Sequence, residues 1–244
     1  IRVPAQVRKA VESVSPDWVI NAAAYTNVDG CENNPELARE VNADGAAHLA
    51  RICREKNIPL LHLSTDFIFN GRGERPYRED DRPGPISVYG RSKRAGEDAI
   101  RKAAGDYCIV RTAWVFGKGG KNFPDTILAA ARQRETLSVV SDQIGTPTYV
   151  VDLAAALEKL ISVGATGIVH FTNRGSCSWF EYAAFVVKIA GLETRIIPAS
   201  SSEIDRPAPR PAYSVLDLSR YRELTGDDPR SWQTAVREYL AERL

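Results

Sequence analysis

The sequence predicts an α/β protein built on a doubly wound parallel sheet. Strand-like and helix-like segments alternate along most of its 244 residues, and such alternation is typical of parallel sheets that carry helices on both faces. Two strand-like segments, residues 58–63 (IPLLHL) and 107–116 (YCIVRTAWVF), are rich in apolar side chains, as expected of strands buried on both faces. The chain is 43% hydrophobic and 26% charged, a balance that suits a sizeable folded core.

The first half of the chain predicts two strands, two helices and a loop. Residues 17–24 (DWVINAAA) predict a short buried strand. Asn34 and Pro35 are suited to be the N-cap and first residue of a helix that continues to Lys56 with apolar residues on one face. The next elements are, in order, a strand at residues 58–63, a polar loop at 70–85 and a helix at 91–104 that ends before Gly105.

The second half continues the alternation. Ser178 and Glu181 have the spacing of a capping box, which predicts the start of a helix. Asp228 and Pro229 predict the start of a last helix, and the proline-rich residues 204–214 predict an ordered loop. The other expected elements are a strand at residues 107–116, a helix at 123–134, a strand at 137–141, a helix at 151–163 and a strand at 168–172.

Charge and cysteine content exclude several classes of function. The 32 Lys and Arg residues nearly balance the 31 Asp and Glu residues, so we expect neither nucleic acid nor a membrane as a partner. The four cysteines show neither a CxxC pair nor a zinc-binding spacing, and the three histidines are scattered. We therefore expect reduced thiols, a cytoplasmic location and no metal site.

A tyrosine and a lysine are the first candidate catalytic residues. Tyr89 and Lys93 are four residues apart in a predicted helical region, so both side chains lie on one face about 5–6 Å apart. At that distance an ammonium favours the tyrosinate by about 3 kcal/mol at an effective dielectric constant of about 20. We therefore expect Lys93 to lower the pKa of Tyr89 from its usual value of about 10.

Two predicted strand ends supply further candidates. Thr65 and Asp66 follow the strand at residues 58–63 almost directly, and ligands of doubly wound sheets bind at the carboxyl ends of the strands. The first strand ends in residues 21–26 (NAAAYT), whose small side chains allow a flat cofactor to approach the backbone. These residues and the Tyr89–Lys93 pair predict one common site.

The combination of NAAA, STD and YGxxK resembles the dTDP-4-dehydrorhamnose reductase family of the extended short-chain dehydrogenase/reductase superfamily. The resemblance implies a Rossmann-like sheet with a smaller C-terminal α/β substrate-binding domain. It also implies NADPH or NADH as cofactor and the reduction of the C4 ketone of dTDP-4-dehydro-6-deoxy-L-mannose to dTDP-L-rhamnose. The stretches that carry it are residues 22–32 (AAAYTNVDGCE), 64–71 (STDFIFNG), Pro76, Tyr77, Glu79, residues 111–116 (RTAWVF), Asn122, Phe123, residues 142–148 (DQIGTPT), Arg210, Pro211 and Ser214.

The resemblance assigns roles to individual residues. It implies that Tyr89 donates the proton to the C4 oxygen, that Lys93 holds the nicotinamide ribose and that Thr65 hydrogen-bonds the carbonyl. The residues expected to bind the cofactor are Ala22, Ala23, Ala24, Tyr25, Thr26, Leu63, Tyr89 and Lys93. The residues expected to bind the substrate are Val28, Thr65, Asp66, Trp114, Asn122, Phe123 and Arg210, the last through the diphosphate.

The sequence departs from the family pattern in two places. Phe67 stands where the family usually has tyrosine, so a hydroxyl is lost beside the sugar. Ahead of residues 17–24 there is neither a further strand nor the glycine-rich turn that cradles a pyrophosphate. We therefore expect that about 40 residues, one βαβ unit, are missing before Ile1, and that the chain as given binds the cofactor poorly.

Two alternative functions remain open. The first is a sugar-nucleotide epimerase or dehydratase of the same superfamily, although Phe67 replaces the second acidic residue that dehydratases show after the threonine. The second is a non-catalytic subunit resembling the regulatory beta subunit of methionine adenosyltransferase. For the domains we expect residues 1–136 to hold most of the cofactor-binding domain with the catalytic residues, and residues 137–244 to form mainly the substrate-binding domain, the two being interleaved. The resemblance is compatible with a homodimer.

Overall fold

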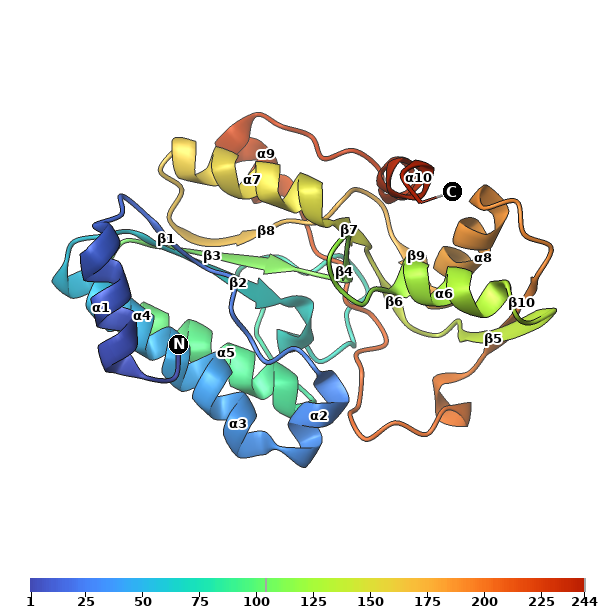
Figure 1. The fold of residues 1–244 in the computed structure, drawn as a ribbon, viewed down its shortest axis with the longest axis horizontal. Coiled ribbons are helices and arrows are strands. Elements are labelled where there is room, and N and C mark those ends of the chain that lie inside the picture. The colour runs from blue at the N-terminus through green and yellow to red at the C-terminus, as the bar shows by residue number, and fades with distance from the viewer. Residues whose placement is uncertain (104, 244) are drawn as a thin grey trace.

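A parallel sheet of four strands forms one half of the computed structural model, which describes residues 1–103 and 105–243 (Figure 1). The strand order is β1-β2-β3-β8, and each neighbouring pair is parallel. The strands are β1 (Val19–Asn21), β2 (Leu60–Thr65), β3 (Tyr107–Thr112) and β8 (Gly167–His170). The expected α/β class with a parallel sheet is confirmed.

Helices cover both faces of this sheet (Figure 1). Leu60 and Ile109 pack against helices on one face, whereas their neighbours Leu61 and Val110 pack against helices on the other. This alternation explains why the strand sequences are apolar at successive positions. The first face carries α1 (Pro4–Val14), α2 (Val28–Asn33), α3 (Pro35–Arg39), α4 (Gly45–Glu55) and α5 (Val88–Ala103), and the second carries α7 (Val150–Ser162) and α9 (Ser219–Thr225).

The other half of the molecule has its own apolar core. In it, β5 (Thr136–Val140) pairs in parallel with β10 (Arg195–Ala199). Its helices are α6 (Phe123–Ala131), α8 (Trp179–Ile189) and α10 (Trp232–Ala241). Two pairs of very short strands connect the halves: β4 (Val115–Phe116) with β7 (Thr148–Tyr149), and β6 (Ile144–Gly145) with β9 (Cys177–Ser178).

Several expected boundaries shift in ways that affect the site. The expected strand 58–63 continues to Thr65, and the helix expected from residue 91 begins at Val88, so Tyr89 lies in its first turn. The expected end of that helix, Ala104, lies outside the described residues. The expected strand 107–116 is divided, because Trp114 adopts a left-handed backbone conformation (φ 46°). The expected helix from Pro35 to Lys56 contains a wider turn at Glu40–Asp44.

Some elements were not predicted, and one start was wrong. The last helix begins at Trp232, with Ser231 as N-cap, and not at Asp228. The backbone before it is held in an extended pairing, because the Arg174 N–H donates to the Arg230 carbonyl and the Trp232 N–H donates to the Arg174 carbonyl. The elements that the sequence did not predict are α2, α9, β6, β7, β9 and β10.

The predicted capping box is present at the start of α8. The Ser178 hydroxyl accepts from the Glu181 N–H at 3.1 Å, and the Glu181 carboxylate accepts from the Ser178 N–H at 2.7 Å. We expect Ser178→Ala to lower the free energy of unfolding by about 1 kcal/mol, because an N-terminal donor of the helix loses its acceptor. Urea unfolding of this variant beside Ser162→Ala, an exposed serine at the end of α7, measures the difference. Equal stabilities of the two variants would contradict the expected effect.

Three structural features concern membrane insertion, metal binding and disulfide bonds. Within residues 1–103 and 105–243, no helix has both the length and the apolar character needed to cross a bilayer. In the same part of the chain, no three His, Cys, Asp or Glu side chains gather as metal ligands would. The four cysteines are free and buried.

Candidate active site

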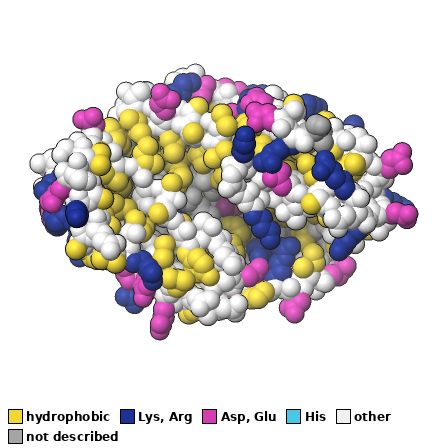
Figure 2. Space-filling view, viewed as in Figure 1, with side chains coloured by type: hydrophobic (Ala, Val, Ile, Leu, Met, Phe, Trp, Pro, Cys, Tyr) yellow, Lys and Arg dark blue, Asp and Glu magenta, His cyan; other side chains and the backbone are white. Residues whose placement is uncertain are grey.

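A cleft of about 630 Å³ lies between the two halves of the molecule, at the carboxyl ends of β2 and β3. Figure 2 shows this face of the molecule hollowed near its centre, with basic side chains gathered beside the hollow. The residues expected at the site that line the cleft are Thr26, Val28, Thr65, Asp66, Tyr89, Trp114, Phe123 and Arg210. Those that lie outside its lining are Ala22, Ala23, Ala24, Tyr25, Leu63, Lys93 and Asn122. The structure therefore brings together two of the three catalytic candidates, Thr65 and Tyr89, and most of the substrate candidates.

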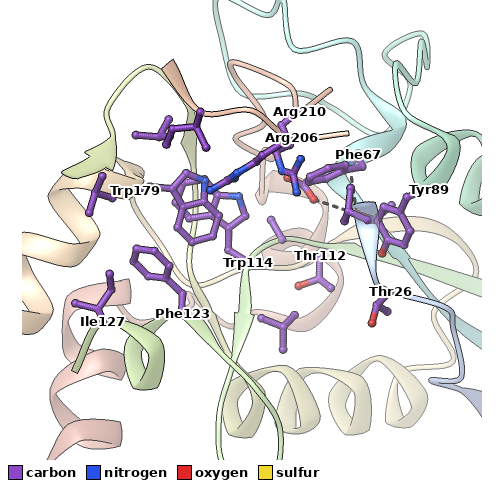
Figure 3. Close-up of a pocket in the computed structure, with 18 of the residues that line it drawn as sticks. Thr26, Phe67, Tyr89, Thr112, Trp114, Phe123, Ile127, Trp179, Arg206 and Arg210 are labelled. Atoms are coloured by element: carbon purple, nitrogen blue, oxygen red, sulfur yellow. Dashed lines mark hydrogen bonds between the residues drawn. The ribbon is translucent and has the colours of Figure 1, made fainter. Parts of the chain in front are cut away.

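Tyr89 lies at one end of the cleft (Figure 3). Thr65 also lines the cleft, and its hydroxyl is close enough to hydrogen-bond the Tyr89 phenol. Thr65 is the last residue of β2; its hydroxyl accepts from the Phe67 N–H at 3.2 Å and donates to the Asp66 carboxylate at 3.1 Å. These bonds fix the rotamer of Thr65 beside the phenol. The ring of Phe67 packs edge-on against the Tyr89 ring, with 5.6 Å between the centroids. A hydroxyl and a phenol thus point to a common position in the cleft.

The prediction that Lys93 lowers the pKa of Tyr89 is wrong, because the pKa of Tyr89 is raised in this structure. Burial raises the pKa of Tyr89 above its usual value; the Thr65 hydroxyl opposes the rise, and the Asp66 carboxylate adds to it. Lys93 shares the helix, but its Nζ extends to β2 and donates to the Leu63 carbonyl at 2.6 Å. The phenol is therefore protonated near neutral pH, which is the state that a proton donor requires.

Lys93 is nearly enclosed and belongs to a chain of buried polar groups. Its Nζ lies 3.3 Å from His62 Nε2, and His62 Nδ1 lies 2.8 Å from the Asn21 side-chain nitrogen. The Asn21 side-chain oxygen accepts from the Ala23 N–H at 3.1 Å. Burial lowers the pKa of Lys93 to about 8, with the Glu97 carboxylate opposing, and burial together with Lys93 lowers the pKa of His62. The chain connects the backbone after β1 with Lys93.

A buried ion pair fixes α5 against the sheet below Thr65. The Arg111 guanidinium donates twice to the Glu97 carboxylate, at 2.9 and 2.8 Å, and both side chains are at most 1% exposed. The Ser64 hydroxyl donates to the same carboxylate at 2.6 Å. Because Ser64 precedes Thr65 and Glu97 follows Lys93 by one helical turn, the pair sets the register of the candidate catalytic residues.

Asp66 is a second buried carboxyl group at the cleft. Burial raises the pKa of Asp66 to about 6, while the hydroxyls of Ser214 and Thr65 oppose the rise. Its Oδ2 has no hydrogen-bond partner among the described residues, and the same holds for the Thr112 hydroxyl on the neighbouring strand. Buried polar atoms without partners are uncommon, so both atoms are suited to contact a polar ligand in the cleft.

Two arginines give the cleft a positively charged side (Figure 3). Arg210 is held by Asp29 through two hydrogen bonds of 2.9 and 2.8 Å. Arg206 lines the cleft without a salt bridge to any described residue, and burial and Arg210 lower its pKa. Arg206 was not predicted as a site residue, because it lies in a proline-rich segment without periodicity and only the tertiary fold brings it to the cleft.

Aromatic side chains line the opposite end of the cleft. The rings of Trp114 and Trp179 stack with 3.5 Å between centroids and 12° between planes, and Phe123 lies 4.6 Å from Trp179 (Figure 3). Trp232 is buried, whereas Trp179 is the first residue of α8 and reaches the cleft.

Two groups of candidates lie away from the cleft lining. Asn122 is buried as the N-cap of α6, where it accepts from the Asp125 N–H at 3.0 Å and lies 3.0 Å from the Tyr239 hydroxyl. Ala22 and Ala23 are exposed directly after β1. Their backbone therefore offers a surface without side-chain bulk at the carboxyl edge of the sheet, beside the polar chain that leads to Lys93.

Comparisons with known proteins agree with this architecture. The sequence profile of the RmlD substrate binding domain family matches residues 1–244. The chain is 43% identical over 244 residues to a Streptomyces griseus protein named dTDP-4-dehydrorhamnose reductase, a match that covers 96% of this chain and 79% of that protein. It is 47% identical over 237 residues to the spore coat polysaccharide biosynthesis protein SpsK of Bacillus subtilis (strain 168), covering 97% and 83%.

Solved structures extend the similarity to three dimensions. The dTDP-4-dehydrorhamnose reductase of Bacillus anthracis str. Ames, solved in complex with NADP, has a TM-score of 0.96 and 38% sequence identity. That match covers 99% of this chain and 86% of the other chain. A dTDP-4-dehydrorhamnose reductase from Clostridium acetobutylicum ATCC 824 has a TM-score of 0.95 and 37% sequence identity, and the match again covers 99% of this chain and 86% of the other chain. The chain therefore belongs to the RmlD substrate binding domain family.

Proposed function

We propose that the protein is an NAD(P)H-dependent reductase that converts the C4 ketone of dTDP-4-dehydro-6-deoxy-L-mannose to the hydroxyl of dTDP-L-rhamnose. The observation that carries this proposal is the pairing of Tyr89 with Thr65 at the cleft, where a carbonyl oxygen can accept from the phenol and, once the Thr65 hydroxyl turns from the Asp66 carboxylate, from that hydroxyl as well. The relative from Streptomyces griseus is named for this reaction. The similar structure from Bacillus anthracis contains NADP.

The residues after β1 and β2 fit a nicotinamide cofactor. Ala22, Ala23 and Ala24 present backbone without bulky side chains, Thr26 opens into the cleft, and Lys93 and Leu63 lie at the adjacent strand end. We assign these residues and Tyr25 to the cofactor, with Lys93 turning from the Leu63 carbonyl to the ribose hydroxyls. Reduced nicotinamide supplies the hydride that adds to C4.

The chain's own residues handle the developing charge on the C4 oxygen. Thr65 hydrogen-bonds this oxygen and orients the ketone, and Tyr89 transfers its proton to the oxygen as the carbonyl becomes an alcohol. A proton from solvent then replaces the one that Tyr89 transfers. For the sugar we assign Val28, Asp66, Trp114 and Phe123, whereas Asn122 acts indirectly by capping α6.

The test of the function follows cofactor absorbance. Purified protein is incubated with dTDP-4-dehydro-6-deoxy-L-mannose and either NADPH or NADH, and the loss of nicotinamide absorbance is compared with the amount of dTDP-L-rhamnose formed. A reductase consumes one reduced cofactor for each product molecule. An epimerase or dehydratase of the superfamily regenerates its cofactor, so turnover without net consumption would replace the proposed reaction. Retention of a methionine adenosyltransferase by the immobilised protein, with no ketosugar turnover, would instead favour the regulatory role.

The two cleft arginines are suited to the diphosphate of the substrate. We expect Arg206→Ala to weaken binding of dTDP about tenfold, because a hydrogen bond between charged groups contributes about 1.5–3 kcal/mol and this arginine is partly exposed. Titration calorimetry with dTDP measures the loss. The matched control is Arg132→Ala, an exposed arginine at the end of α6 and outside the cleft lining. Equal affinities of the two variants for dTDP would remove Arg206 from the site.

We also propose that the two parts of the chain have different functions. Most of residues 1–136 bind the cofactor and carry the catalytic residues, and most of residues 137–244 bind the substrate. The two parts are interleaved: α6 belongs to residues 1–136 but packs in the second core, and α7 belongs to residues 137–244 but packs on the first sheet.

We expect the protein to act in the cytoplasm. We also expect a homodimer, and light scattering of the purified protein tests this expectation.

A further inference from the structure

Trp114 holds a backbone conformation that most side chains avoid. Its φ is 46°, in the left-handed region that favours glycine. Such a conformation costs about 1–3 kcal/mol and persists only where the surroundings hold it, most often at functional sites. One of these constraints is the hydrogen bond of 3.2 Å that the Thr148 N–H donates to the Trp114 carbonyl. The strained backbone breaks the strand after Thr112 and turns the indole into the cleft.

Two residues from other elements confine this indole. Trp179 stacks on it with 3.5 Å between ring centroids. Gly145 lets it lie directly against the backbone, because a Cβ atom at Gly145 would come within 2.5 Å of the indole Cε2. The pairing of β6 with β9 places Gly145 opposite Cys177, two residues before Trp179. One short antiparallel pairing therefore supplies both constraints.

The confined indole lies at the aromatic end of the cleft, and strand β3 connects it directly with the reacting end. Thr112 is opposite Thr65 in the parallel register of β2 and β3, and Trp114 is two residues beyond Thr112. The face of an indole is apolar and suits the C–H groups and the methyl group of a 6-deoxy sugar. This position therefore favours contact with the sugar over contact with the nucleoside.

We propose that Gly145 and Trp179 are positioning residues that fix the Trp114 indole as the surface against which the 6-deoxy sugar lies. The identity of the sugar rests on the proposed function, whereas the placement of the indole does not. Gly145 lies in residues 142–148, which carry the family resemblance, but the sequence assigned no role to it or to Trp179, because neither a two-residue strand nor the first residue of a helix shows a periodic pattern.

The experiment combines spectroscopy with binding. Two stacked indoles couple their electronic transitions, so the native protein should show an exciton couplet in circular dichroism. We expect Gly145→Ala and Trp179→Leu to remove the couplet and to bind dTDP-rhamnose about fivefold to tenfold more weakly, as for the loss of an aromatic contact. Affinity for dTDP alone should remain within about twofold, because the missing contact is with the sugar. Calorimetry measures both ligands.

Control variants separate this effect from a general loss of structure. Gly120→Ala adds a methyl group in open space, and Trp18→Phe removes an indole outside the cleft, so both should keep the couplet and both affinities. Trp179→Phe should lose the couplet but restore most of the affinity for dTDP-rhamnose, since a phenyl ring still supports the indole. If Trp179→Leu fails to fold, Trp179→Phe still tests whether a ring at this position supports the indole.

The outcomes distinguish the inference from the proposed function. A native protein without a couplet, or a Gly145→Ala protein that loses the couplet yet binds dTDP-rhamnose as tightly as the native protein, would overturn the inference. A native protein with a couplet that is sensitive to Gly145→Ala, but with no affinity for dTDP-rhamnose, would overturn the proposed function and leave the placement of the indole supported.

Discussion

Replacement of Tyr89 by phenylalanine is expected to lower kcat by about 100-fold to 10,000-fold, the usual contribution of a positioned general acid. The phenol is the group beside Thr65 that carries a transferable proton, and burial raises its pKa so that the proton is present near neutral pH. Phenylalanine keeps the ring that packs against Phe67, with 5.6 Å between centroids, so the wall of the cleft should persist. Steady-state turnover of the ketosugar measures the loss.

Binding measurements show whether the loss lies in the chemical step. Tyr89→Phe should bind dTDP-rhamnose within about tenfold of the native affinity, because a single hydrogen bond contributes about 0.5–1.5 kcal/mol to ground-state binding. Tyr107→Phe is the matched control, since Tyr107 begins β3 at the opposite end from the cleft and should keep native turnover. Turnover by Tyr89→Phe within a few fold of the native rate would rule out the phenol as the acid.

The part of the site at the first sheet could be predicted because its geometry is local or follows from the topology. Thr65 ends an apolar parallel strand, and Tyr89 lies in the helix that leads to the next strand, so both reach the same edge of the sheet. The direction of the Tyr89 pKa could not be predicted in this way. It depends on burial and on the reach of Lys93 to the Leu63 carbonyl, and both are tertiary properties.

The far side of the cleft was less predictable for a different reason. Trp179 and Arg206 come from segments joined by strands of two residues or by a proline-rich loop, which are too short or too irregular to show a period. Gly145 illustrates the same limit. Its lack of a side chain matters only because the Trp114 indole lies against it, and that contact joins segments about 30 residues apart in the chain.

Replacement of Arg111 by methionine is expected to lower the free energy of unfolding by about 3–5 kcal/mol, because a carboxylate buried without its partner is costly. Glu97 is fully buried, and with Arg111 gone it keeps the hydrogen bond from Ser64 and a longer contact of 3.5 Å with Arg94, but it loses its two short bonds to the Arg111 guanidinium. Denaturant unfolding measures the change. Arg8→Met is the control, since its ion pair with Glu55 is exposed and should contribute about 0–1 kcal/mol.

A second variant tests whether the cost comes from the unpaired charge. Glu97→Leu combined with Arg111→Met removes both ions, and we expect it to recover most of the stability lost in the single variant. The two residues also position the site, since Ser64 loses its acceptor next to Thr65. The double variant should therefore fold but turn over more slowly than the native protein, with its affinity for dTDP retained. Glu97→Leu alone is measured in the same way. If the losses of stability of Arg111→Met and Glu97→Leu simply add in the double variant, the pair contributes to stability through packing, and the electrostatic account of its effect is wrong.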